Sequence, residues 1–317
     1  MIQASIDWIM YGLAGLDPAS HAMKSLNFFL SDTVKILLML FVFIAIVGFL
    51  RTYISPIKVR NWLSKKRFGA SNIVASTFGA ITPFCSCSSI PIFLSFIKSG
   101  VPLGVTFSFL ITSPLVNEYL VVLMLGFFGW KITALYVLSG MVLGVIIGLI
   151  MGKLGLEKYL EKDIVKSAEL KEQNYLNLKE RILFGIDEAL SILKKLWIWI
   201  LVGVGVGAII HNYIPSEVIQ SVISKGGIFT VPIAVLLGVP MYGSCAAIVP
   251  IAVVLFNKGV PLGTALAFMM ATAALSFPEA IILRRAMKLK LILIFFGIVT
   301  LGIIFTGYLF NLLQVLL

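Results

Sequence analysis

The stretch Thr82-Pro83-Phe84-Cys85-Ser86-Cys87-Ser88-Ser89-Ile90-Pro91 interrupts an otherwise apolar run that extends from about residue 70 to residue 97. It holds two prolines, four hydroxyl side chains and two of the three cysteines of the chain. In a bilayer every backbone N–H and C=O group needs a partner, so a break at membrane depth is tolerated only inside protein or beside a cavity. The stretch therefore predicts two half-helices that meet within a helical membrane protein.

The composition agrees with this interpretation. Of the 317 residues, 60% are hydrophobic and only 12% are charged, and the mean hydropathy is +1.06. A soluble domain has about 25% charged residues. The chain is therefore predicted to be an all-α polytopic membrane protein. Apolar segments of spanning length recur at about residues 33–54, 70–97, 102–127, 131–152, 189–212, 228–256, 261–283 and 290–313.

The net charge of +11 does not indicate a nucleic-acid partner, because the Lys and Arg residues cluster in short loops between apolar segments. Such loops are typical of the cytoplasmic side of a cell inner, or plasma, membrane. The basic loop at 51–69 and the mixed segment at 153–188 are both predicted to be cytoplasmic, which places the N-terminus outside. Residues 1–31 are weakly amphipathic and are predicted to form an interfacial segment.

The second half of the chain repeats the first at an offset near 160 residues, as between Gly100 and Gly259. The turn Gly100-Val101-Pro102-Leu103-Gly104 recurs letter for letter as Gly259-Val260-Pro261-Leu262-Gly263. Four matches in one order indicate an internal duplication, with repeats at 32–152 and 189–317 joined by a cytoplasmic linker at 153–188. The other three matches are Tyr53-Ile54-Ser55-Pro56 with Tyr213-Ile214-Pro215-Ser216, Phe84-Cys85-Ser86-Cys87 with Tyr242-Gly243-Ser244-Cys245, and Ser113-Pro114-Leu115-Val116-Asn117-Glu118 with Ser276-Phe277-Pro278-Glu279.

The charges also predict how the two repeats are oriented. Three apolar segments separate the two cytoplasmic regions of the first half, and an odd number of crossings cannot return to one side, so one segment is re-entrant. The second half is likewise expected to contain one re-entrant segment. Each half then makes an odd number of net crossings, so the two halves have opposite orientations in the membrane. This is an inverted-topology repeat with broken or re-entrant helices that meet near the midplane. Which broken segment re-enters stays open, and full crossing by all the segments makes the repeats parallel instead.

Three cysteines lie at the two breaks and are the candidate binding groups. Cys85 and Cys87 flank Ser86, and Cys245 follows Ser244 at the equivalent point of the second repeat. A half-helix that begins at such a break favours thiolate through its dipole, and oppositely oriented repeats bring the three thiols into one cavity. Soft thiolates suit thiophilic ligands and poorly suit Mg²⁺ or phosphate. For Cys245 alone, a role as a small apolar filler is an equal alternative.

Neither a resident metal ion nor a cofactor is expected. No C-x-x-C pattern is present, and the two histidines lie outside the breaks. No Gly-x-x-x-x-Gly-Lys-[Ser/Thr] loop is present either, so transport is expected to be driven by a gradient and not by ATP hydrolysis. Glycines at four-residue spacing predict close helix packing: Gly140, Gly144, Gly148 and Gly152.

Two acidic residues are candidates for proton coupling. Glu118 and Glu279 are each the only acid of an apolar segment. An acid at a helix centre costs roughly 2.5–3.5 kcal/mol on insertion scales, so an intramembrane Glu marks a functional site. Glu118 lies nearer the middle of its segment and is the stronger candidate, whereas Glu279 has the alternative of an interfacial ion pair with Arg284. Polar neighbours are expected to hydrogen-bond nearby: Ser113, Asn117 and Ser276.

The run from Thr82 to Pro91 resembles the signature of the ArsP-type organoarsenical efflux permeases. The resemblance extends to residues 243–245, to both Gly-Val-Pro-Leu-Gly turns and to residues 276–279, and it covers nearly the whole chain. It implies export of trivalent organoarsenicals such as methylarsenite and reduced aromatic arsenicals. A neutral R–As(OH)₂ species exchanges hydroxyls for thiolates, and aromatic side chains pack its organic group. The implied site residues are Thr82, Phe84, Cys85, Ser86, Cys87, Tyr242, Ser244 and Cys245.

Two other hypotheses stay open. The first is a permease for thiophilic metal ions, Cu(I) or Zn(II), or for small sulfur compounds, which uses the same cavity. The second is a membrane thiol oxidoreductase that cycles Cys85 and Cys87, although a spacing of two residues is awkward for an unstrained disulfide. The preferred function is a permease and not an enzyme, with a small metalloid substrate and the lipid bilayer as partners. The oligomeric state is left open.

Overall fold

The computed structural model describes residues 6–13, 21–53, 69–82, 86–98, 100–161, 177–213, 227–240, 245–257, 259–284 and 286–314. Within these residues the chain is helical, and the one extended pairing is an isolated bridge between Leu160 and Met287. The elements in chain order are η1 (Trp8–Leu13), α2 (His21–Arg51), α4 (Ala70–Ile81), α5 (Ser86–Lys98), α6 (Leu103–Leu115), α7 (Glu118–Lys153), η2 (Leu156–Tyr159), α9 (Leu178–Tyr213), η3 (Gly227–Phe229), α11 (Thr230–Gly238), α12 (Cys245–Asn257), α13 (Leu262–Ala274), α14 (Phe277–Leu283) and α15 (Leu289–Leu313).

Several helices have the length and the apolar surface of membrane spans. Three segments of the described chain are long and apolar enough to cross a bilayer: Leu120–Lys153, Leu262–Leu283 and Leu289–Leu313. One face of α2 is also apolar and exposed, at four-residue spacing. Its side chains are Leu26, Leu30, Val34, Leu38, Val42 and Ile46. A surface of this kind is stable only against lipid or another apolar partner, and the prediction of an all-α polytopic membrane protein is confirmed.

Two helices begin earlier than the sequence predicts. α2 begins at His21 and not at residue 33, so it takes in the last part of the predicted interfacial segment. α9 begins at Leu178 and not at residue 189, inside the predicted linker. The extra turns of α9 are held by tertiary contacts, which hydropathy does not report. The guanidinium of Arg181 donates to the Thr52 carbonyl oxygen at 2.9 Å and lies 4.3 Å from the centre of the Tyr53 ring.

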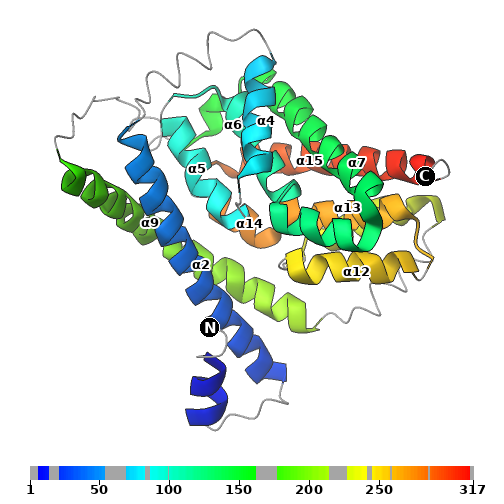
Figure 1. The fold of residues 1–317 in the computed structure, drawn as a ribbon, viewed down its shortest axis with the longest axis horizontal. Helices are drawn as coiled ribbons and strands as arrows, with labels where there is room; N and C mark the ends of the chain where they lie inside the picture. Colours follow the sequence, from blue (N-terminus) through cyan, green and yellow to red (C-terminus); the bar gives the residue numbers. More distant parts are fainter. Residues whose placement is uncertain are drawn as a thin grey trace.

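The helices α2 and α9 pack against each other in antiparallel fashion. Gly185, near the start of α9, lies against the backbone of Ala45 and Phe49 near the end of α2. Gly205, near the end of α9, lies against the Phe29 ring near the start of α2. In Figure 1 this pair lies along the lower left side of the molecule, and the other helices gather to its upper right. The pair contacts that body mainly through α5 and α14.

The helix α4 runs parallel to α6. The Asn72 amide donates to the Ser108 hydroxyl at 2.9 Å, and one turn later the Ser76 and Thr112 hydroxyls lie 2.9 Å apart. All four side chains are buried. Because the residue numbers rise together along both helices, the two helices point the same way. Hydrogen bonds of this kind hold helices together in lipid, where apolar burial gives little preference.

The helix α5 runs antiparallel to α6, so α4 and α5 form a helical hairpin. Near the start of α5, the Ser89 hydroxyl lies 2.7 Å from the Ser113 hydroxyl near the end of α6. Further along α5, the ring centres of Phe93 and Phe107 are 5.3 Å apart. The residue numbers therefore fall along α6 as they rise along α5. The structure identifies the first broken segment, 70–98, as the one that folds back on itself, which the sequence left open.

The helix α7 turns back at Gly129 and its longer part returns beside α6. Gly129 has a φ of 75° and a ψ of 174°, outside the helical range. Past this kink, Gly140 faces the break that follows α6, and Gly144 faces Thr112. Gly148 lies so close to Gly104 that a Cβ there would be 2.6 Å from the Gly104 carbonyl oxygen. The predicted close packing of the glycine row is confirmed.

Replacing Gly148 with alanine is expected to lower the melting temperature of the protein in detergent. The new methyl group would overlap the Ser108 hydroxyl as well as the Gly104 carbonyl, and overpacking of this kind typically costs about 1–3 kcal/mol. Gly297→Ala in α15 is the matched control, because no atom lies within 4 Å of its Cβ position. It is expected to melt at or above the temperature of the parent protein, since alanine favours a helix. Equal melting of the two variants would contradict the packing.

The second half repeats this succession of elements. The helices α5 and α12, like α6 and α13, all have 13 residues. The turns between them match as well. Gly100 and Gly259 have φ values of 72° and 87°, and each N–H donates to the carbonyl three residues earlier, at 2.9 Å. These positive φ angles favour glycine over other residues. Gly263 then packs against Gly307 of α15, as Gly104 packs against Gly148.

Two pairs of helices at corresponding places in the two halves run in opposite directions. The returning part of α7 corresponds to α15, and the two are antiparallel. Leu143 contacts Gly302 midway along both helices, and Leu160, just past α7, pairs with Met287, just before α15. The equivalent pair α2 and α9 is antiparallel too. This arrangement is the one that an inverted repeat requires, and the orientation of each half across a bilayer stays a prediction.

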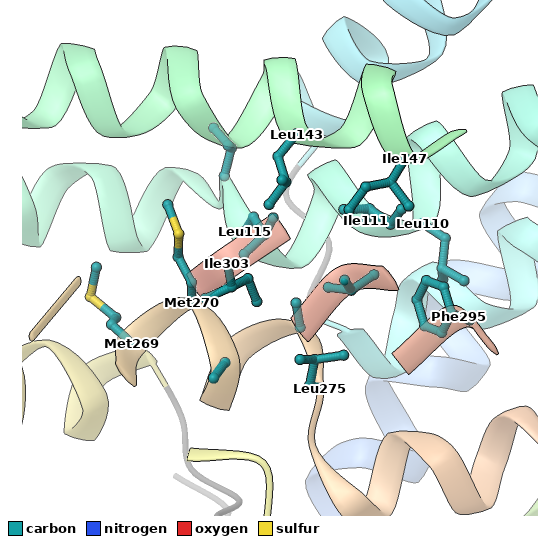
Figure 2. Close-up of a cluster of buried hydrophobic side chains, with 14 of the residues drawn as sticks. Leu110, Ile111, Leu115, Leu143, Ile147, Met269, Met270, Leu275, Phe295 and Ile303 are labelled. Atoms are coloured by element: carbon teal, nitrogen blue, oxygen red, sulfur yellow. The ribbon is translucent and has the colours of Figure 1, made fainter. Parts of the chain in front are cut away.

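A large apolar core joins the two halves. Figure 2 shows its side chains coming from α6, α7, α13 and α15. Phe107 of α6 and Phe295 of α15 have ring centres 5.2 Å apart. Ten labelled members of the cluster are Leu110, Ile111, Leu115, Leu143, Ile147, Met269, Met270, Leu275, Phe295 and Ile303. Because this core spans both repeats, they form one body, to which α9 also contributes Ala189, Ile200 and Val204.

Candidate functional site

Among the described residues, two kinds of helix interruption occur in each half. One separates α4 from α5, and at the corresponding place α11 from α12, which we call the second hairpin by this correspondence; the other separates α6 from α7 and α13 from α14. The arms α4 and α5 have 12 and 13 residues, which is about 18–20 Å of helix. A bilayer core is about 30 Å thick, so an arm that enters from one surface reaches about the middle. The breaks are therefore expected near the midplane.

The first hairpin tip begins at Thr82, which ends α4. Its hydroxyl donates to the carbonyl oxygens of Phe78 at 2.8 Å and Gly79 at 3.2 Å. Thr82 thus satisfies groups left open by the helix end and has a structural role in addition to its predicted one. Phe84 and Cys85 lie outside the described residues. Ser86 and Cys87 form the start of α5, and only their backbone is described.

The second hairpin tip is described only at its far side. Tyr242 and Ser244 lie outside the described residues, and Cys245 is the first residue of α12. The helix α12 therefore begins at a cysteine, and α5 begins one residue before one. The backbone N–H groups at a helix start carry a partial positive charge, which favours a thiolate or another electron-rich group beside them. Contacts among the three thiols stay a prediction.

Each hairpin packs against the interrupted span of the other half. The helix α5, with Cys87 near its start, contacts α14 of the second half. In return α12, which starts with Cys245, contacts α7 of the first half, where the Phe128 and Phe256 ring centres are 5.9 Å apart. The ring contact lies at the far end of α12 from Cys245 and ten residues along α7 from Glu118, so the helices lie beside each other but these two side chains are not brought together by it.

The two glutamates have different surroundings. Glu279 of α14 is 2% exposed, and its backbone N–H donates to the Ser276 hydroxyl at 3.4 Å, which caps the helix. Glu118 begins α7 and is exposed. The structure thus shows which of the two candidates is buried, and the role of each in proton coupling stays a prediction. The predicted alternative for Glu279, an ion pair with Arg284, is not formed, because Arg284 pairs with Glu161 at 3.4 Å.

Sequence reasoning missed a row of buried polar side chains in the first half. These residues link α4, α5 and α6, and they extend from the first turn of α6 to the break that follows it. The row consists of Asn72, Ser76, Ser89, Ser108, Thr112 and Ser113. The four-residue spacing of Asn72 and Ser76, and of Ser108 and Thr112, within apolar helices is a signal that the sequence contains. No group of three or more potential metal ligands occurs among the described residues.

Comparisons with known proteins point to a membrane permease. The model of the family ArsP_1, described as "Predicted permease", matches residues 21–312. A protein of Streptococcus mutans serotype c, described as "Putative two-component membrane permease complex subunit", is 23% identical over 206 residues, covering 64% of this chain and 67% of that protein. The UPF0718 protein MJ0584 of Methanocaldococcus jannaschii is 21% identical over 295 residues, with coverage of 75% and 81%. No solved structure matches the chain.

Proposed function

Since the chain belongs to the predicted permease family ArsP_1, and is therefore a membrane transporter and not an enzyme, we propose that it exports trivalent organoarsenicals. The export is secondary transport through a thiol-lined site, with a proton gradient as the driving force. The substrates are methylarsenite and reduced aromatic arsenicals. The membrane is the cell inner membrane, with the N-terminus outside.

The reciprocal packing of hairpins and interrupted spans is the observation that carries this proposal. Transporters with inverted repeats bind their substrates where discontinuous helices meet near the midplane. Here α5 and α12 begin at or beside cysteines and pack against α14 and α7. Cys85, Cys87 and Cys245 are the proposed arsenic ligands, because trivalent arsenic is thiophilic and soft ligands favour soft acceptors.

The groups around the thiols have supporting roles in this proposal. Ser86, Ser244 and Thr82 provide hydroxyls near the hairpin tips, and Phe84 and Tyr242 pack the organic group of the substrate. A phenyl or methyl substituent gains free energy from such apolar contact, and this favours organic over inorganic arsenicals. Glu279 is the proposed proton carrier, since it is buried on the helix that packs against α5.

Uptake into everted membrane vesicles tests the function directly. Vesicles that contain the protein are expected to accumulate methylarsenite when energised, with little accumulation of arsenite or Cu(I). Collapse of the proton gradient by an uncoupler is expected to abolish the accumulation. Vesicles from cells without the protein give the background. Accumulation of Cu(I) in place of methylarsenite would favour the metal-ion permease, and accumulation that survives the uncoupler would exclude proton coupling.

We also propose that the protein works together with a second subunit. The relative from Streptococcus mutans is described as one subunit of a two-component permease complex. Purification of the protein from its native membrane in mild detergent shows whether another chain accompanies it. The vesicle assay with the protein expressed alone shows whether that chain is needed for transport.

A further inference from the structure

A hollow lies at one end of the helical body, away from the hairpin tips. It has a volume of about 480 Å³ and is lined by residues from four segments of the chain. These are the kink of α7, the end of α12, the start of α13 and the residue that follows α15. Three of the four are element ends and the fourth is a kink, an arrangement expected where helices emerge from the membrane core. Its size falls within the range of about 300–1,000 Å³ found for small-molecule sites.

The walls of the hollow are held in place by contacts between its lining residues. Gly129 turns α7 back on itself, and no atom lies within 4 Å of its Cβ position, so the kink leaves open space. The Phe128 and Phe256 rings meet edge to face at 5.9 Å. The backbone N–H of Leu262 donates to the side-chain oxygen of Gln314 at 2.7 Å. The end of the chain is thereby tied to the start of α13.

The lining combines apolar walls with one positive charge. Phe128, Phe256 and Leu262 make the apolar part, and Lys131 is the one charged residue among the described residues that line the hollow. Lys131 is exposed, and its neighbour Trp130 is 70% exposed. Tryptophan and lysine are typical of the interface between the bilayer and water, where one end of the side chain is apolar and the other is wet.

From this arrangement we propose that the hollow binds an anionic phospholipid. The phosphate group pairs with the Lys131 ammonium, and the first part of an acyl chain lies against Phe128, Phe256 and Leu262. A soluble anion matches the charge of the hollow but gains nothing from its apolar walls. A neutral lipid matches the walls but leaves the ammonium without a counter-ion. An anionic lipid matches both, and it reaches the site by lateral diffusion in the membrane.

Native mass spectrometry of the full-length protein tests the proposal. The protein is transferred from mixed micelles that contain equal amounts of phosphatidylglycerol and phosphatidylcholine, and the lipids that stay bound are counted. The parent protein is expected to retain phosphatidylglycerol in preference, by about fivefold, which corresponds to about 1 kcal/mol for one basic side chain near an anionic membrane surface. Equal retention of the two lipids by the parent protein would overturn the proposal.

Three variants separate the site from the general charge of the protein. Lys131→Gln is expected to lose the preference for phosphatidylglycerol, and Lys131→Arg is expected to keep it. Lys179→Gln, which removes an exposed lysine at the start of α9, is the control for net charge and is expected to behave like the parent protein. An undiminished preference in Lys131→Gln, or an equal loss in Lys179→Gln, would contradict the site. These readouts do not depend on the transported solute, so they stand apart from the test of organoarsenical export.

Discussion

The variant Cys85→Ser/Cys87→Ser is expected to lose protection of a sensitive host against methylarsenite almost completely. Serine keeps the shape of the side chain but replaces the soft sulfur with a smaller and harder oxygen, which binds thiophilic arsenic weakly. Removing a residue that only hydrogen-bonds to a metal ligand already lowers the affinity for the metal by about 10–100-fold. Removing two direct ligands is therefore expected to lower the affinity for arsenic by at least about 100-fold. The measurement is methylarsenite uptake into everted vesicles across a range of concentrations.

The third thiol provides a graded comparison for this experiment. Cys245→Ser removes one proposed ligand and leaves the pair in the first hairpin, so an intermediate loss of uptake is expected. Each variant is checked for its amount in the membrane and its melting temperature, because α5 and α12, which begin at or beside these cysteines, pack within the body of the protein. Uptake by the double variant at the level of the parent protein, with equal expression, would refute a thiol mechanism.

The variant Glu279→Gln is expected to uncouple transport from the proton gradient. Glutamine has nearly the same shape as a protonated glutamic acid and cannot release a proton. In lipid an acidic side chain is costly unless it has a function or a partner, and Glu279 is 2% exposed on a helix that packs against α5 and α9. Binding or release of a proton at Glu279 is therefore expected to change the free energy of packing between α14 and α5, the helix that begins beside the proposed thiol site.

Proteoliposomes with an imposed gradient of one pH unit give the size of the effect. One proton per substrate sustains a concentration ratio of up to about tenfold, since one pH unit is equivalent to about 1.4 kcal/mol. The parent protein is expected to approach this ratio for methylarsenite, and Glu279→Gln is expected to reach a ratio of about one. Glu118→Gln is the matched control, because Glu118 is exposed at the start of α7. If Glu118→Gln no longer sustains the concentration ratio of methylarsenite and Glu279→Gln still sustains it, the coupling residue is Glu118.

The positions of the helix breaks could be predicted from the sequence. A proline or a cluster of hydroxyl residues within an apolar run is a local signal, because it removes or competes for backbone hydrogen bonds that a helix in lipid requires. The structure has interruptions after Ile81, after Leu115, after Gly238 and after Ala274, as the sequence predicted. The internal duplication was equally visible, because the turns at Gly100 and Gly259 need the same residues for the same backbone angles.

The choice between the two glutamates could not be made from the sequence. Both follow a break and lie in the first turn of the next helix, so their local surroundings are alike. They differ in what covers them. The helix α14 is covered by α9 and α5, whereas the start of α7 leaves Glu118 exposed. Burial depends on helices far away in the chain, and neither hydropathy nor spacing reports such contacts.

The sequence by itself determined that this protein is a broken-helix membrane protein with cysteines at its breaks, because composition, prolines and glycine turns act locally. Only the tertiary structure decided that the segment 70–98 folds into a hairpin and that α7 runs antiparallel to α15, as α2 does to α9. A half-helix has the same local hydrogen bonds whether its partner continues onward or folds back. The direction of each helix therefore depends on contacts between helices, such as Asn72 with Ser108 and Leu143 with Gly302.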